Sequence, residues 1–224
     1  MPVTKINREV QKLKKITGSS EKTGWVKENV AHLLSGFVRY ADVNLVVNIG
    51  HLWGKSALVF CDAMFNNRDF EDNWDPGDDP FSTHSRRNTN DSEIREVHSV
   101  DPLIQPLGHR PLHAHPEGTD FIKSCYPGFT FHNEKSDLFF LTFDFAPYKR
   151  KMIFIDGDHS YEGALRDCQN AIRNNFDFII IDDTSYIPHI EKAARDSLVK
   201  SYDFLSLPYW NGLNIAAEEY CGLE

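Results

Sequence analysis

The sequence has few cysteines, no long apolar run and fewer basic than acidic residues. Its four cysteines lie far apart and form no CxxC pair, so we expect reduced thiols in a cytoplasmic protein. No apolar run reaches the length of a membrane-spanning helix, and no apolar signal core stands at the start, so no membrane segment is expected. The net charge of −9 argues against a broad nucleic-acid-binding surface.

The length and composition fit a single α/β domain over residues 1–224. Hydrophobic residues make up 41% of the chain, which is enough for a substantial core. Residues 1–40 are predicted to form an N-terminal helical segment, with an amphipathic helix over 20–40. Residues 66–96 are polar and more acidic than basic, which predicts a mobile insertion at the surface.

Apolar runs typical of strands alternate with segments of helical periodicity along the rest of the chain. Strands are predicted over residues 43–49, 96–101, 129–132, 154–156, 179–183, 202–207 and 212–217. Helices are predicted between them, over residues 55–65, 118–125, 136–146, 160–174 and 189–201. This alternation predicts a doubly wound, mostly parallel sheet with helices on both faces.

Two of the apolar runs stop abruptly in carboxylates. Asp156 follows the run that begins at Phe154, and Asp182 and Asp183 follow Ile181. Ligands of open α/β sheets bind beyond the carboxyl ends of the strands, so we expect these three side chains to converge on one site. Their mutual repulsion would be relieved by a hard cation such as Mg²⁺ or Ca²⁺. The alternative is that each aspartate caps the helix that follows it.

A glycine-containing turn follows the first predicted strand. Gly50 permits the tight turn from strand to helix, and Gly54 lets the backbone approach a ligand closely. Nucleotide-binding folds place an acid about 20 residues further on, at the end of the second strand, where it binds ribose hydroxyls. Asp101 has about this spacing once the segment 66–96 is left out. It is therefore a ribose-binding candidate, and the alternative is a turn aspartate before Pro102.

Together these motifs resemble the class I S-adenosylmethionine-dependent methyltransferases. The resemblance rests on Gly50-x-x-x-Gly54-Lys-Ser56, Ser99-Val-Asp101-Pro, Phe154-Ile-Asp-Gly-Asp-His-Ser-Tyr-Glu-Gly163 and Ile181-Asp-Asp-Thr. The most similar branch is the macrocin- and catechol-type O-methyltransferases. The resemblance implies a Rossmann-like seven-stranded sheet whose last strand is antiparallel. It also implies S-adenosylmethionine as cofactor and a small hydroxylated molecule or sugar as methyl acceptor.

The resemblance also implies roles for individual residues. The implied cofactor contacts are Asn48, Gly50, Gly54, Ser56, Asp101, Ser136 and Asp156. The implied Mg²⁺ ligands are Asp156, Asp182 and Asp183, and the implied general base is His159. An imidazole titrating near neutrality suits that task. A helix-capping or structural role is the alternative for His159.

Three positions depart from the family pattern. Asn48 stands where an acid is frequent, and Lys135 stands where an adenine-side acid is frequent, so Glu134 or Asp137 would have to replace that acid. The sequence Asn174-Asn175 replaces a Gly-Gly turn, and asparagine tolerates the left-handed backbone that such a turn needs.

Several alternatives stay open at this point. A protein of the same fold with hydroxylase-like chemistry, or a non-catalytic cofactor-binding module, would share these motifs. A nicotinamide-dependent oxidoreductase is disfavoured because the third glycine of its fingerprint is missing. The cluster His109, His113 and His115 is interpreted as a polar loop, with transition-metal binding as the alternative. The sequence is also compatible with a homo-oligomer.

Overall fold

The computed structural model describes Val26 and residues 28–52, 54–65, 94–102, 116–199, 202–207 and 213–217. The acidic segment up to residue 93, the histidine cluster at 109–115, Trp53 and Cys221 lie outside the described residues, as does the chain before Val26. Predictions that fall on those segments stay predictions.

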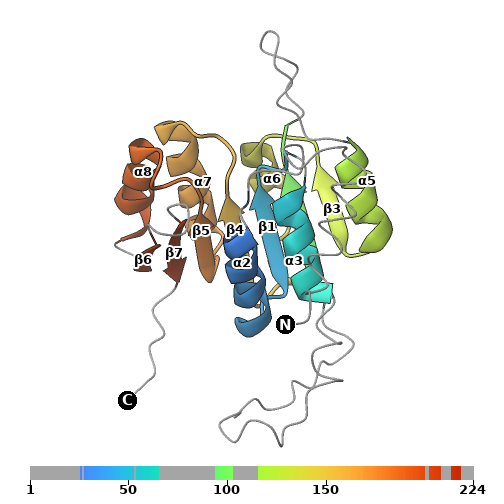
Figure 1. The fold of residues 1–224 in the computed structure, drawn as a ribbon. Coiled ribbons are helices and arrows are strands. Elements are labelled where there is room, and N and C mark those ends of the chain that lie inside the picture. Colours follow the sequence, from blue (N-terminus) through green and yellow to red (C-terminus); the bar gives the residue numbers. More distant parts are fainter. Residues whose placement is uncertain are drawn as a thin grey trace, which may run out of the picture.

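Strands and helices alternate along the described chain (Figure 1). The elements are α2 (Glu28–Tyr40), β1 (Leu45–Ile49), α3 (Lys55–Phe65), β2 (Glu96–Val100), α5 (Pro116–Cys125), β3 (Phe129–His132), α6 (Ser136–Thr142), β4 (Lys151–Ile155), α7 (Tyr161–Arg173), β5 (Phe178–Ile181), α8 (Pro188–Leu198), β6 (Asp203–Leu207) and β7 (Leu213–Ala217). Of the helix predicted over 20–40, the structure describes Val26, which is not helical, and α2 from Glu28 to Tyr40. Residues 20–25 and 27 lie outside the described residues.

The strands form one sheet in the order β3-β2-β1-β4-β5-β7-β6. Neighbouring strands from β3 to β5 pair in parallel, and β7 runs antiparallel to both β5 and β6. The predicted α/β architecture with a mostly parallel sheet is confirmed. The strand order reverses between β1 and β4, which is where open α/β sheets bind their ligands.

Helices cover both faces of the sheet and create two apolar cores (Figure 1). One core packs α2, α3 and α5 against β1 and β2 through residues such as Val46, Phe60 and Val97. The other packs α6, α7 and α8 against the opposite face through residues such as Val47, Phe139 and Ile179. All five residues of β1 are buried, as expected for a parallel strand covered on both faces.

The turn before β5 shows how this chain replaces a glycine turn. Asn175 has a φ of 51°, in the left-handed region that asparagine tolerates better than most residues. The prediction for the Asn174-Asn175 turn is therefore confirmed in its backbone geometry.

Two further expectations concern cysteines and membranes. Cys61, Cys125 and Cys168 are free in the structure. Within the described ranges, every helix is too short or too polar to cross a membrane.

Candidate active site

A cavity of about 1020 Å³ lies at the carboxyl ends of β1, β2, β4 and β5. Five of the predicted cofactor residues line it: Gly50, Ser56, Asp101, Ser136 and Asp156. The predicted metal and base residues Asp182, Asp183 and His159 line it as well. The sheet thus brings together the two groups of residues that the sequence places far apart.

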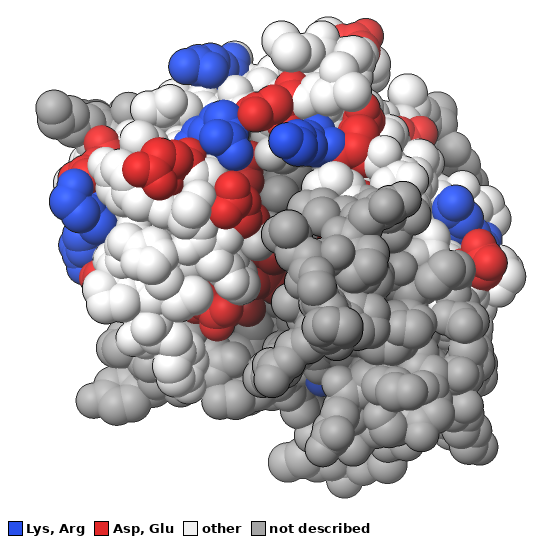
Figure 2. Space-filling view, turned by 90° about the horizontal axis from the view of Figure 1, so that it is seen from above, with Lys and Arg blue, Asp and Glu red and all other residues white. Residues whose placement is uncertain are grey.

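The view onto this edge of the sheet shows a hollow with acidic side chains gathered beside it and basic side chains at its rim (Figure 2). The basic side chains that line the cavity are Lys55, Lys135 and Arg166. Arg166 is already engaged, since its Nε lies 3.0 Å from Asp137 Oδ2. The lining is therefore predominantly acidic near the ends of β4 and β5.

The turn after β1 requires glycine at two positions. Gly50 and Gly54 have φ values of 90° and 80°, which L-residues rarely adopt. A Cβ on Gly50 would lie 2.1 Å from the carbonyl oxygen of Asp156, and one on Gly54 would lie 2.7 Å from Ile122 Cδ1. The bare backbone of this turn therefore fits against the end of β4 and beside the cavity, as expected of a turn that holds a nucleotide-like cofactor.

Asp101 holds the same turn from the end of β2. Its Oδ2 accepts hydrogen bonds from the backbone N–H groups of His51 (2.7 Å) and Leu52 (3.1 Å). Leu52 has a φ of 45°, so the carboxylate stabilises a strained part of the turn. Asp101 also lines the cavity. The turn-aspartate and ligand-binding interpretations of Asp101 are thus compatible with each other.

Asn48 stabilises the turn through the hydrogen bonds of its side chain. Its side chain is fully buried, and its Nδ2 donates hydrogen bonds to the carbonyl oxygen of Gly50 and to Ser99 Oγ, both at 2.7 Å. Its Oδ1 is buried without a hydrogen-bond partner in the described part of the chain. Of the predicted cofactor contacts, Asn48 and Gly54 are absent from the lining of the cavity. Its visible role is to fix Gly50.

His51 completes a buried polar network that no sequence motif predicts. Its Nδ1 lies 2.8 Å from Ser99 Oγ, and its Nε2 lies 2.9 Å from Thr119 Oγ1. Since Ser99 accepts from Asn48, its own proton is available for Nδ1, which leaves Nε2–H to donate to Thr119. Burial lowers the pKa of His51 to about 4, and the positive charge of Lys123 adds to this effect. The imidazole is therefore neutral near pH 7.

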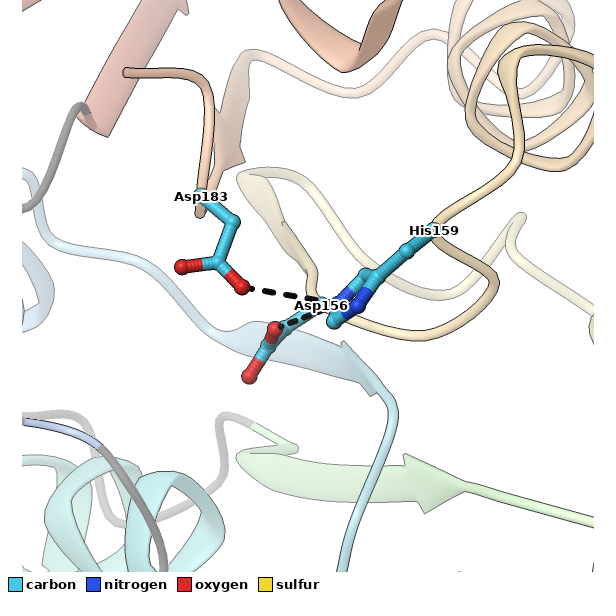
Figure 3. Close-up of side chains that lie close together, drawn as sticks. All are labelled: Asp156, His159 and Asp183. Atoms are coloured by element: carbon cyan, nitrogen blue, oxygen red, sulfur yellow. Dashed lines mark hydrogen bonds and ion pairs between the residues drawn. The ribbon is translucent and has the colours of Figure 1, made fainter. Parts of the chain in front are cut away.

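Asp156, His159 and Asp183 form a compact group at the ends of β4 and β5 (Figure 3). His159 Nε2 lies 3.3 Å from Asp156 Oδ1 and 3.7 Å from Asp183 Oδ2. One ligand atom from each residue lies within 4.8 Å of the others, which is close enough for the three to share one cation. Asp183 has a φ of 57°, a strained conformation of the kind that clusters at functional sites.

Asp182 differs from the other two predicted metal ligands. Its side chain is buried, and its Oδ1 accepts a hydrogen bond of 2.9 Å from the backbone N–H of Asp183. It lies outside the compact group, in which His159 is the third member. Burial, together with the negative charge of Asp156, raises the pKa of Asp182 to about 7.

The charges in the group influence one another. Desolvation in the half-buried site raises the pKa of Asp156. The hydrogen bond with Asp156 raises the pKa of His159. The arrangement therefore favours a protonated imidazole beside the carboxylates when no other cation balances their charge.

The start of α7 fixes the loop that carries His159. Ser160 is the N-cap, and its hydroxyl accepts a hydrogen bond of 3.0 Å from the backbone N–H of Gly163. Asp158 Oδ1 accepts from the backbone N–H of Ser160 at 3.0 Å. From α8, His189 Nε2 donates a hydrogen bond of 2.7 Å to the carbonyl oxygen of His159. The base candidate thus stands on a loop held from two helices.

No protein-family model matches the sequence, and no curated protein is significantly similar to it. Solved structures of similar fold do exist. The SAH-bound methyltransferase PaMTH1 of Podospora anserina is 10% identical, with a TM-score of 0.60, and the match covers 96% of this chain and 87% of that one.

Two O-methyltransferase structures are similar to the same degree. The enzyme of Bacillus cereus in complex with SAH is 12% identical, with a TM-score of 0.59, and the match covers 97% of this chain and 93% of that one. TomG of Streptomyces achromogenes in complex with SAM, an enzyme involved in tomaymycin synthesis, is 10% identical, with a TM-score of 0.58, and the match covers 96% of this chain and 90% of that one. The chain therefore has the fold of these methyltransferases.

Proposed function

We propose that this protein is an S-adenosylmethionine-dependent O-methyltransferase that acts on a small hydroxylated molecule or sugar. One observation carries the proposal. A single cavity contains both the glycine turn after β1 and the group of Asp156, His159 and Asp183 after β4 and β5. The first suits a nucleoside cofactor, and the second suits the activation of a hydroxyl.

The cofactor would lie along the turn that Gly50 begins. Gly50, Asp101 and Ser136 all line the cavity. The backbone at Gly50 would contact the cofactor, Asp101 would accept from its ribose hydroxyls, and Ser136 would lie on the adenine side. When bound, S-adenosylmethionine supplies a methyl group on a positively charged sulfur. The acidic lining near Asp156 favours that charge.

The carboxylates of Asp156 and Asp183, with Asp182 behind them, fit a hard divalent cation such as Mg²⁺. When bound, such an ion lowers the pKa of a hydroxyl that it polarises. Burial and, after it, repulsion by Asp156 raise the pKa of Asp182, and an occupied site would offset the repulsion.

His159 would act as the general base. Its imidazole borders the cavity and is half exposed, so an acceptor hydroxyl can reach it. His159 takes the hydroxyl proton, and the neighbouring carboxylates of Asp156 and Asp183 stabilise the imidazolium that forms. The hydrogen bond from His189 to the carbonyl oxygen of His159 would hold the loop that carries the imidazole, so that the ring stays within reach of an acceptor hydroxyl placed in line with the methyl group.

The test is methyl transfer from labelled S-adenosylmethionine to a panel of sugars and catechols, with Mg²⁺ or with excess EDTA. We expect transfer to at least one acceptor, and its loss in EDTA while calorimetry still detects SAH binding. Methyl transfer at the full rate in excess EDTA would contradict the proposed role of the metal ion. Failure of the wild type to bind SAH would contradict the function as a whole.

A further inference from the structure

Asp167, on α7, is a buried carboxylate that borders the cavity and has no role in the proposed methyl transfer. Its side chain is 1% exposed, yet it is part of the cavity lining near Ser136. Ser136 Oγ donates a hydrogen bond of 2.6 Å to its Oδ1. No hydrogen bond to Oδ2 is formed within the described residues, so this oxygen is left to a ligand in the cavity.

Two acids near Ser136 are already engaged, Asp137 in the cavity lining and Glu134 outside it. Asp137 accepts from Arg166 Nε at 3.0 Å and from Asn170 Nδ2 at 3.4 Å. Glu134 Oε1 lies 3.5 Å from His132 Nδ1. Asp167 is held by a neutral hydroxyl and is more deeply buried than either. Asp167 Oδ2 is not one of the fully buried atoms that lack a partner among the described residues, so it is open to the cavity that the residue lines, where a donor from a ligand can reach it.

We propose that Asp167 Oδ2 accepts a hydrogen bond from the exocyclic amino group of the cofactor's adenine and thereby selects adenine over other purines. This inference rests on the proposed function. Ser136, the residue on the adenine side, positions the carboxylate through its hydroxyl. Lys135, at the N-cap of α6, has no acceptor to offer an amino group, which leaves this task to the acid on α7.

The chemistry predicts discrimination between two purines. Adenine presents a donor at position 6, whereas hypoxanthine presents a carbonyl oxygen there, which would face the carboxylate without a proton between them. A site built to accept a hydrogen bond rejects a ligand that lacks the donor more strongly than an apolar pocket rejects a change in size. We expect at least about a hundredfold preference for SAH over S-inosylhomocysteine.

The test is calorimetric titration of both ligands into the wild type, Asp167→Asn and Asp137→Asn. A pH of about 8 keeps Asp167 ionised, since burial raises its pKa to about 6. An amide at position 167 can still accept from Ser136 and presents an NH₂ group to the ligand. We therefore expect Asp167→Asn to weaken SAH and strengthen S-inosylhomocysteine, so that the preference collapses or reverses. Asp137→Asn tests the other candidate acid of the cavity lining and should keep the wild-type preference; a preference lost in Asp137→Asn and kept in Asp167→Asn would overturn the assignment.

Each outcome decides the question. A wild-type preference retained in Asp167→Asn, or an equal loss of affinity for both ligands with unchanged thermal stability, would overturn the role of Asp167 while leaving the cofactor assignment intact. A wild type that binds neither ligand would overturn the proposed function and this inference together.

Discussion

At the scale of single residues, the site depends on side chains that hold backbone as well as on those that face the cavity. Asn48 and His51 form a buried network that ends at the carbonyl oxygen of Gly50. The sequence marked Asn48 as a departure from a family acid, but it could not show that the amide points into the protein. His51 carried no signal, because burial of a polar residue by its neighbours is a property of the folded chain.

The buried imidazole of His51 makes stability depend on pH. Its pKa is about 4 in the folded protein against an ordinary 6.5. As the pH falls below about 6.5, the unfolded chain takes up a proton that the folded chain takes up only near about 4. The contribution of His51 to the free energy of unfolding is thus complete above about pH 6.5. About 3 kcal/mol is lost as the pH falls toward about 4.

Urea unfolding at about pH 7.5 and pH 5 measures this effect. In His51→Gln the difference in unfolding free energy between the two pH values should shrink by at least about 1 kcal/mol. The control His32→Gln changes an exposed histidine on α2 and should keep the full difference. An unchanged difference in His51→Gln would show that another group is responsible.

Replacement of His159 tests the base. His159→Ala should lower the rate of methyl transfer by about two to four orders of magnitude, the usual range for a lost general base. SAH affinity, measured by calorimetry, should change little, because the role proposed for His159 is toward the acceptor hydroxyl and not toward the cofactor. A rate within a factor of about three of the wild type would exclude His159 as the base.

At the scale of elements, the order of the strands and the helices that connect them determine where the site residues lie. The helix 55–65 and the strand 129–132 have their predicted bounds, because apolar periodicity is strong there. Boundaries moved at strand ends as well as at helix ends: β4 (Lys151–Ile155) begins before the predicted residue 154, and β5 (Phe178–Ile181) ends before the predicted residue 183. α8 begins at Pro188 and ends at Leu198 rather than near 201, since the final turns of a helix depend on local contacts.

The cap of α7 offers a test at this scale. Ser160→Ala removes the hydroxyl that accepts from the backbone N–H of Gly163. The loss of an N-cap of this kind costs about 1 kcal/mol, which corresponds to about 3 °C in the melting temperature of a domain of this size. Ser160→Asp keeps a capping oxygen and should melt close to the wild type. Equal losses in both variants would mean that the cap contributes nothing.

At the scale of the whole molecule, the strand order explains why residues from distant segments meet. The reversal of order between β1 and β4 opens the cavity where the glycine turn and the aspartates lie. The sequence predicted this convergence from the strand ends alone. It did not predict that His159 would replace Asp182 in the compact group, because that depends on the left-handed backbone at Asp183 and on the burial of Asp182.

The measurement that tests the central claim most directly is a crystal structure of the protein with SAH and Mg²⁺. The account predicts the adenosyl group between Asp101 and Ser136, its sulfur toward Asp156, and the ion on Asp156 and Asp183. Density for SAH elsewhere on the molecule, or a cavity that contains only water at saturating SAH, would contradict the account.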